Sequence, residues 1–540
     1  MIGFEAQMRG AKASGVGHGR RRFPAFLSVA LALCGMVLAS GGGATAATAV
    51  DCADLSGQGL PGATITSVEE VAAGQVSIPK SRFNLFSAFN LTGRVEQGSN
   101  PAMCRVAAVL KPTPASNIKI EVWLPKDHWN GKFLGVGNFG WAGSIIQDGL
   151  LSGVQAGYAV AATDTGHDGA ASQGGGAWSM GNPEALVDYA WRADHEMTLV
   201  AKRLIQTYYG KAAEKSYWIG CSLGGLEGLI EAKRFPEDYD AMAIGAPPNP
   251  LVDFNALQIW PWWLISQKAE RQIPREKYTM IHDAVLKACA TPQGQRDGVV
   301  DRPQNCAFRP SSLLCTHGDA ADCLTAPQVE LLEETYAGPL DPVTGKRIFP
   351  GPAKGAELEM FGSASDQPMS VALDLFRYTA FHKLDWDAKT IDWHKDISAA
   401  KAKLDPLLSV TPEDLEPFLN RGGKILFYIG STDYHNPEQL ADFYGKALAK
   451  AGNDAKDQLR LFVIPGMAHC SNGTGCDTFD KLGILDTWDL RGAAPDRITT
   501  SKIEDGKVVR VRPVCAWPSV ASYVGTGSED DPENYRCQMN

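Results

Sequence analysis

The chain has 540 residues, of which 44% are hydrophobic and 21% are charged, so its composition is that of a globular protein. This length exceeds what one hydrophobic core usually spans, and we expect either two folding units or one core with a large insertion. The net charge of −10 argues against nucleic acid as a partner and against stable association with anionic membranes.

Residues 1–46 have the pattern of a signal peptide. Arg20-Arg21-Arg22 precedes an apolar run over residues 26–39 that is short for a membrane span, and Ala44-Thr45-Ala46 matches a cleavage site. A permanent membrane anchor is the alternative, and the adjacent arginines also fit a twin-arginine leader. We therefore predict a protein that is secreted or periplasmic.

The cysteines support export. The sequence has 12 cysteines, and Cys34 lies in the predicted leader, so the remaining odd number leaves at least one thiol unpaired. The sequence contains no C-x-x-C pair. Disulfides formed in an oxidising compartment are therefore a better explanation than metal clusters.

Short apolar segments in the first half of the chain predict strands. Residues 118–123 alternate as a strand, residues 132–136 run into the glycine-rich turn 137–140, and residues 158–163 form a further short apolar run. Residues 184–209 carry apolar side chains at intervals of three and four, which is typical of a helix. This alternation predicts a mostly parallel sheet covered by helices.

The next strand ends in a serine flanked by glycines. Gly220-Cys221-Ser222-Leu223-Gly224 matches G-x-S-x-G and lies between a strand at residues 216–219 and a helical run at residues 225–234. Such a turn lifts the serine hydroxyl out of the sheet and leaves the N–H of Leu223 free to face an oxyanion. We predict that Ser222 is a nucleophile, against the alternative of an ordinary tight turn.

The strand–helix alternation breaks after residue 247. A tryptophan-rich stretch leads into four closely spaced cysteines, and strands resume only at residues 424–430 and 459–465. The predicted fold class is α/β, with an α/β-hydrolase core that has a mostly parallel sheet. We expect this core to cover residues 47–247 and 410–540, with a large inserted lid domain over residues 248–409.

A serine hydroxyl needs a base, and an α/β-hydrolase places an acid and then a histidine downstream of the serine. His469 lies in the loop after the last strongly apolar strand, and Asp433 lies in the turn after the strand before it. We predict that Asp433 orients His469 and that His469 deprotonates Ser222. A surface contact between His435 and Asp433 is the alternative.

A second oxyanion donor should come from the loop after an earlier strand. The turn Gly137-Asn138-Phe139-Gly140 provides glycines there, and we favour the N–H of Gly140, with Gly137 as the alternative. The same glycines would also suit a turn that needs only a positive φ. Close to the predicted triad, Cys221 precedes the serine and Cys470 follows the histidine. If bonded, they would hold base and nucleophile together; two buried free thiols are the alternative.

These residues resemble the tannase and feruloyl esterase family, and the chain is also similar to bacterial mono-(2-hydroxyethyl) terephthalate hydrolase. The resemblance spans nearly the whole mature chain. It rests on the Cys-Ser, Asp and His-Cys arrangement together with these segments: Gly137-Asn138, Trp141 to Ile145, Thr163 to His167, Glu231-Ala232 and Arg234 to Asp240.

The resemblance implies five disulfides: Cys52–Cys104, Cys221–Cys470, Cys289–Cys306, Cys315–Cys323 and Cys515–Cys537. It leaves Cys476 unpaired. It also implies a structural calcium in the lid, but where the family has three carboxylates this chain keeps only Asp297, with Ala290 and Gln293 at the other two positions. Asp297 and Val299 are what would remain of such a site. Because a hard dication needs several charged oxygens, we do not expect tight calcium binding.

The resemblance further implies an enzyme that cleaves feruloyl-, galloyl- or benzoyl-type esters through an acyl-enzyme, with no cofactor required. The small-molecule aromatic ester would bind under the lid, where Arg377 could meet a phenol or a carboxylate. Candidate pocket aromatics are Trp260, Trp262, Trp263, Phe376, Phe381 and Trp386. The alternatives are a terephthalate half-ester hydrolase, a general esterase without aromatic preference, or a non-catalytic binding protein with the same fold.

Overall fold

The computed structural model describes residues 49–76, 78, 88–94, 98–141, 143–169, 175–364, 367–452 and 456–539. The predicted signal peptide, Cys34 and Ala142 lie outside the described residues. Among those described, no helix combines the length and the apolarity that crossing a membrane requires.

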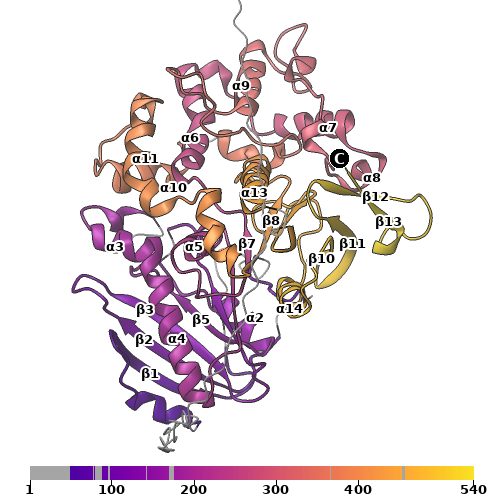
Figure 1. Ribbon diagram of the computed structural model, residues 1–540. Helices are drawn as coiled ribbons and strands as arrows, with labels where there is room; N and C mark the ends of the chain where they lie inside the picture. The colour runs from indigo at the N-terminus through magenta and orange to yellow at the C-terminus, as the bar shows by residue number, and fades with distance from the viewer. Residues whose placement is uncertain are drawn as a thin grey trace, which may run out of the picture. The chain divides into compact units, whose positions relative to one another are not determined.

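A nine-stranded sheet organises the molecule, with strand order β1-β2-β3-β5-β4-β6-β7-β8-β9 (Figure 1). The first three strands and their pairing with β5 are antiparallel, and the pairs from β5 to β9 are parallel. The bounds are β1 Ala63–Val71, β2 Met103–Leu110, β3 Ile118–Pro125, β4 Lys132–Val136, β5 Ala159–Thr163, β6 Lys215–Cys221, β7 Ala241–Gly245, β8 Lys424–Gly430 and β9 Leu459–Ile464. The sheet is therefore mostly parallel, as the alternation of strands and helices predicts.

The parallel strands are short apolar runs because helices cover them. Every residue of β5 and β7 is buried, as expected where a sheet is covered on both faces. The covering helices are α2 Gln147–Gln155, α3 Pro183–Val187, α4 Ala193–Tyr209, α5 Leu223–Arg234, α13 Pro437–Ala451 and α14 Lys481–Arg491. The helix predicted over residues 184–209 is thus divided, since a π-helical turn, Asp188–Arg192, separates α3 from α4.

The stretch between β7 and β8 contains helices and no named strand in the part of the chain that the structure describes. These helices are α6 Leu251–Gln267, α7 Lys277–Cys289, α8 Pro292–Asp297, α9 Ala326–Ala337, α10 Ser370–Asp374, α11 Lys395–Leu408 and α12 Glu416–Asn420. A separate hydrophobic cluster forms within this stretch, around Tyr278, Ile281 and Leu332. This arrangement agrees with an insertion that has its own small core.

Two hairpins complete the chain. They pair β10 Arg497–Glu504 with β11 Lys507–Cys515, and β12 Ser519–Tyr523 with β13 Tyr535–Met539. Neither hairpin was among the predicted elements, because their polar, half-exposed strands lack the apolar runs of the central sheet. In Figure 1 they lie beside α8, so the end of the chain reaches the inserted helices.

Candidate active site

Ser222 occupies a sharp turn between β6 and α5. Its backbone has φ 61° and ψ −128°, a strained conformation that a non-glycine residue adopts only where the surroundings impose it. The flanking glycines allow the backbone segments to pack closely here, because a side chain at either position would clash. A Cβ at Gly220 would lie 2.1 Å from the Gly224 carbonyl oxygen, and one at Gly224 would lie 2.8 Å from the Asn138 carbonyl oxygen. The geometry is that of a nucleophile elbow.

The glycine-rich turn after β4 packs directly against this elbow. Gly224 N–H donates to the Asn138 carbonyl at 2.8 Å, and Asn138 N–H donates to the Glu227 carboxyl at 2.7 Å. Gly137 N–H donates to the Ile219 carbonyl at 3.0 Å and is therefore committed to the sheet. Gly140 has φ 53° and its carbonyl accepts from Tyr189 Oη at 2.9 Å, so its peptide is held in place. Of the two glycines considered as oxyanion donors, Gly140 is the better candidate, together with Leu223 at the start of α5.

Asp433 and His469 meet at the ends of β8 and β9. His469 Nδ1 lies 3.0 Å from each carboxylate oxygen of Asp433, and Asp433 is fully buried. The backbone N–H of His435 also donates to Asp433 Oδ1, at 2.8 Å. Because Nδ1–H donates to the carboxylate, Nε2 is left as the acceptor that a general base requires.

His435, the alternative partner of Asp433, uses its ring elsewhere. Its Nδ1 lies 2.8 Å from the Ala246 carbonyl, to which it donates, and its ring stacks on His469 with centroids 4.0 Å apart. Burial, and then the charge of His469, holds the pKa of His435 well below its usual value. His435 is therefore a neutral ring packed on His469, and the ring paired with Asp433 is that of His469.

A disulfide joins the two halves of the candidate site. Cys221 and Cys470 are bonded, with their Cα atoms 6.0 Å apart. Since Ser222 and His469 are each one residue from this bridge, their Cα atoms lie within about 14 Å of each other. The Cys470 sulfur also lies 3.6 Å from His469 Nε2, so the basic edge of the imidazole is on the side of the bridge.

A cavity of about 210 Å³ lies next to the neighbours of Asp433 in the chain, although Ser222, Asp433 and His469 are not themselves among its lining residues. The hydrolase core contributes Thr432 and Tyr434, the two neighbours of Asp433 in the chain, to the lining of this cavity. The other lining residues belong to the stretch between β7 and β8 and are mostly apolar. The lining residues are Leu257, Gln258, Pro261, Trp262, Thr335, Pro352, Ala356, Glu359, Met360, Pro368, Met369, Thr432 and Tyr434. Burial, and then the charge of Asp433, raises the pKa of the Glu359 carboxyl, while His469 opposes this rise.

Trp262 is the one predicted pocket aromatic that lines this cavity. Arg377, Phe381 and Trp386 do not line it. Arg377 Nε donates to the Trp386 carbonyl at 2.9 Å, and the Phe381 and Trp386 rings pack together with centroids 5.8 Å apart. Glu359, Tyr434 and Met360 were not predicted, because an acid, a tyrosine and a methionine in irregular segments carry no sequence signal of their own.

The remaining disulfides are those that the resemblance implies: Cys52–Cys104, Cys289–Cys306, Cys315–Cys323 and Cys515–Cys537. Cys476 is free and buried. Burial raises the pKa of its thiol to about 11, so the thiol stays protonated and unreactive near neutral pH.

The lid segment in which the resemblance implies calcium does not suit that ion. Pro292–Asp297 is the helix α8 rather than an open loop, and Val299 N–H returns to the Gly294 carbonyl at 2.8 Å. Arg512 of β11 binds both oxygens of Asp297, at 2.7 and 2.8 Å. The guanidinium of Arg512 thus neutralises Asp297, which is the one family carboxylate that this chain keeps. The residues present therefore do not form a calcium site.

Comparisons with known proteins agree with this geometry. The family model for tannase and feruloyl esterase matches residues 104–538. An uncharacterized esterase of Xanthomonas campestris is 33% identical, covering 91% of this chain and 92% of its own. A probable feruloyl esterase B-2 of Aspergillus flavus is also 33% identical, over 75% of this chain and 80% of its own.

The fold has a solved counterpart. The crystal structure of feruloyl esterase B from Aspergillus oryzae superposes with a TM-score of 0.80 and 28% identity, covering 90% of this chain and 99% of that one. The predicted α/β-hydrolase fold is therefore confirmed, and the protein is a carboxylic ester hydrolase, as predicted. The chain belongs to the tannase and feruloyl esterase family.

Proposed function

We propose that this protein is a secreted serine esterase that cleaves esters of aromatic acids through an acyl-enzyme. The observation that carries the proposal is the pair formed by buried Asp433 and His469. The Cys221–Cys470 disulfide ties this pair to Ser222, because Ser222 follows Cys221 in the chain and His469 precedes Cys470. An imidazole oriented by a buried carboxylate, on a chain segment that a disulfide ties to the segment of a strained serine, supports activation of the serine hydroxyl.

The reaction takes two steps. His469 removes the proton of Ser222 as its oxygen attacks the ester carbonyl, and the N–H groups of Leu223 and Gly140 stabilise the oxyanion. The imidazolium then protonates the departing alcohol. In the second step His469 activates water, which releases the acid from the serine. No cofactor is required by these steps.

The cavity next to the neighbours of Asp433 supports an aromatic acid as the acyl group. Trp262, Met360 and Tyr434 give it an apolar, partly aromatic lining that favours a planar ring. Glu359 supplies one carboxyl, which can accept from a phenolic hydroxyl and would repel a second carboxylate. We therefore favour feruloyl-, galloyl- or similar phenolic esters over a terephthalate half-ester.

Secretion is supported by two features. The first 46 residues have the pattern of a signal peptide, and five disulfides are present in the described part of the chain. Periplasmic retention would satisfy the same features. Fractionation of cells that express the full chain would separate the two, and cytoplasmic protein with reduced thiols would contradict both.

A serine-directed phosphonate should label Ser222, and Ser222→Ala should lower kcat/KM by at least about 10⁴-fold, because the nucleophile is lost while the fold remains. The measurement is hydrolysis of methyl ferulate, methyl gallate, a terephthalate monoester and p-nitrophenyl butyrate. Ser266→Ala is the control, since the Ser266 hydroxyl donates to the Trp263 carbonyl and accepts from Gln267, both within α6.

The substrate panel decides between the alternatives. Rates highest on ferulate or gallate support the proposed substrate class, equal rates on p-nitrophenyl butyrate indicate a general esterase, and a preference for the terephthalate monoester indicates a half-ester hydrolase. Background rates on all four esters, unchanged by Ser222→Ala, would contradict the serine mechanism and leave the non-catalytic alternative.

A further inference from the structure

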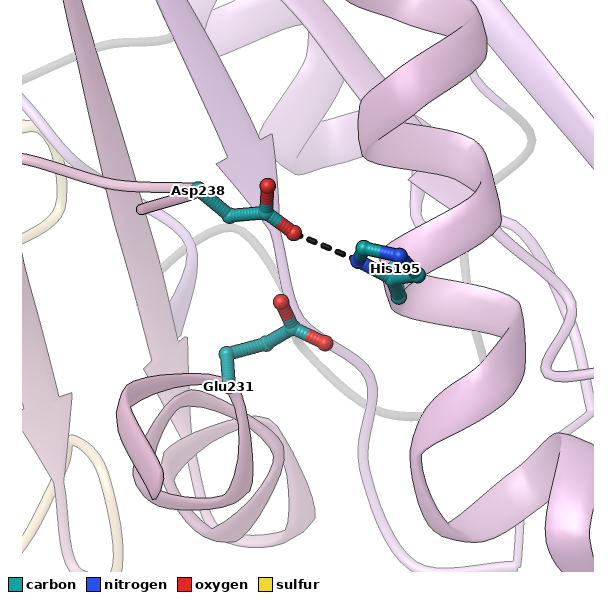
Figure 2. Close-up of side chains that lie close together, drawn as sticks. All are labelled: His195, Glu231 and Asp238. Carbon is teal, nitrogen blue, oxygen red and sulfur yellow. Dashed lines mark hydrogen bonds and ion pairs between the residues drawn. The ribbon is translucent and has the colours of Figure 1, made fainter. Parts of the chain in front are cut away.

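A second cluster of polar side chains lies behind the elbow helix, apart from the candidate active site. His195 comes from α4, Glu231 from α5, and Asp238 from the turn between α5 and β7, and Figure 2 shows both carboxylates directed toward the space beside the imidazole. One ligand atom from each residue lies within 4.8 Å of the others. The shortest approach is 2.7 Å, between His195 Nδ1 and Asp238 Oδ2.

Glu231 is the member of this cluster that lacks a partner. It is fully buried, and neither of its carboxylate oxygens accepts a hydrogen bond from a donor among the described residues. A buried carboxylate in this condition is unfavourable by several kcal/mol unless a cation or a proton compensates it. Either a proton on Glu231 or a bound cation must therefore compensate this carboxylate, because no donor among the described residues does so.

The surroundings add negative charge. Asp194 on α4 and Glu227 on α5 are also buried, and Asp194, Asp238 and Glu227 all raise the pKa of Glu231 beyond the effect of burial itself. The neighbouring cation is Lys202, whose Nζ donates to the Asp238 carbonyl and lies 3.9 Å from Asp238 Oδ1. The Lys202 ammonium therefore pairs with Asp238 and makes no ion pair with Glu231.

One imidazole nitrogen and two carboxylate oxygens form a ligand set that zinc and similar divalent ions prefer, whereas calcium and magnesium prefer oxygen alone. Tetrahedral zinc with bonds of about 2.1 Å needs ligand atoms about 3.4 Å apart. The present separations, from 2.7 Å to at most 4.8 Å, bracket that value. Small side-chain rotations would bring the ligand atoms to this spacing, and the His195 side chain is 20% exposed, so solvent can supply a water as fourth ligand.

We propose that His195, Glu231 and Asp238 bind a zinc-type divalent cation that ties α4 to α5 and to the turn before β7. The ion replaces the proton between His195 and Asp238 and neutralises Glu231. Its role is structural, because the cluster lies on α4 and on the later turns of α5, away from the elbow. The competing occupant is a proton shared between Glu231 and Asp238.

The test uses the tag-free mature protein, dialysed against a chelator and then titrated with zinc. We expect one tightly bound equivalent by elemental analysis and a Tm that rises by several degrees, because a ligand that binds only the folded state stabilises it. His195→Ala and Glu231→Gln should each remove both effects. Glu231→Gln matters most, since glutamine mimics the protonated acid and leaves a proton-occupied cluster undisturbed.

His282→Ala is the matched control, because His282 is paired with buried Glu357 at 2.9 Å but these two belong to no three-ligand group within the described part of the chain, and this variant should keep the zinc equivalent. Should a variant fail to fold, cobalt added to the unaltered protein should give the visible absorption of a low-symmetry, imidazole-ligated site. No bound equivalent, no cobalt spectrum, or a full zinc response in Glu231→Gln would overturn the proposal. Ester hydrolysis is not the readout, so the outcome is independent of the proposed function.

Discussion

Lys481 is a buried cation at the start of α14. Its ammonium donates to the Asn90 carbonyl at 3.0 Å and lies 4.4 Å from the centre of the Phe479 ring. Burial lowers the pKa of Lys481 from 10.5 to about 8, although Asp477 and Asp480 oppose this. The folded protein therefore releases this proton more readily than the unfolded chain does.

Replacement of this lysine should change how stability depends on pH. The unfolded state binds more protons here between pH 8 and 10.5, so this group makes the protein more stable as the pH rises through that range, and the gain is lost as the pH falls to 8. From pH 7 to 9, the free energy of unfolding should rise by about 1 kcal/mol more in the unaltered protein than in Lys481→Met.

Urea denaturation at the two pH values measures this difference. Lys446→Met is a suitable control, since Lys446 is exposed and pairs only with Asp442 one turn away. The same pH dependence in Lys481→Met and in the unaltered protein would mean that Lys481 keeps an ordinary pKa.

Among single residues, the sequence predicts those that the α/β-hydrolase fold places in a fixed order along the chain. Ser222, Asp433 and His469 could be named because each must follow a strand end in a fixed succession, and they stay predictions until labelled or substituted. Glu359 and Lys481 could not be named. Their significance comes from burial and from neighbours remote in sequence, which no local pattern records.

At the scale of elements, the Cys221–Cys470 bridge joins the end of β6 to the loop that follows β9. It spans 249 residues, whereas the Cys315–Cys323 bridge in the insertion spans 8. Loop-closure entropy depends on this length, and gives about 5 kcal/mol for the long bridge against about 2.5 kcal/mol for the short one.

The two bridges should therefore differ in both stability and activity. The Cys221→Ala/Cys470→Ala double variant should lose more stability than Cys315→Ala/Cys323→Ala and should also lose at least about tenfold in kcat, because loosening the geometry of base and nucleophile slows proton transfer. Denaturant midpoints and ester hydrolysis rates check this. Equal activity in the two double variants would show that the long bridge does not position the site.

Elements with an apolar signature could be predicted, and the others could not. Strands β4, β5, β6, β8 and β9 follow from their short apolar runs, and α5 follows from the turn before it. The π-helical turn at Asp188–Arg192 was missed because its residues also suit an ordinary helix. The polar strands β10 to β13 were missed because alternation is weak where both faces of a hairpin meet solvent.

On the scale of the whole molecule, Arg512 links two remote parts of the chain. It joins the C-terminal hairpin to α8 of the insertion through Asp297, and both side chains are largely buried, at 16% and 10% exposure. The inserted helices are thus anchored by an ion pair at the position where the resemblance implies calcium.

Calcium should accordingly have no stabilising effect. After chelator treatment, millimolar calcium should leave Tm unchanged within about 1 °C, because an ion that does not bind the folded state cannot stabilise it. Thermal unfolding followed by circular dichroism measures this. A rise of several degrees on calcium addition would contradict the conclusion that Arg512 excludes the ion.

Replacement of Arg512 should lower the stability of the folded protein. Arg512→Gln removes the two-point contact with the largely buried Asp297 and leaves it only the longer Arg510 contact, at 3.5 Å, and the Gln293 amide, which should lower the free energy of unfolding by about 2 kcal/mol. Arg347→Gln is the matched control, since its partner Glu438 is exposed and such pairs contribute about 0–1 kcal/mol. Similar losses in the two variants would mean that the buried pair is no stronger than a surface contact.

The interruption of the strand–helix alternation between β7 and β8 could be predicted, but the contacts that the intervening helices make could not. Nothing in the local sequence connects Asp297 with Arg512, or Trp262 with Tyr434, because these pairs are set by how separate helices and hairpins fold back on one another.

The distance along the chain between Cys221 and Cys470 also has a consequence for biosynthesis. A ribosome-bound chain from which residues 459–470 have not yet emerged contains the elbow but neither β9 nor the second thiol of the bridge. Such a nascent polypeptide therefore lacks part of the candidate triad, and under the proposed mechanism we expect it to be inactive. Under the proposed mechanism, hydrolysis begins only after the segment that carries His469 has docked, and the rate then increases when the disulfide closes.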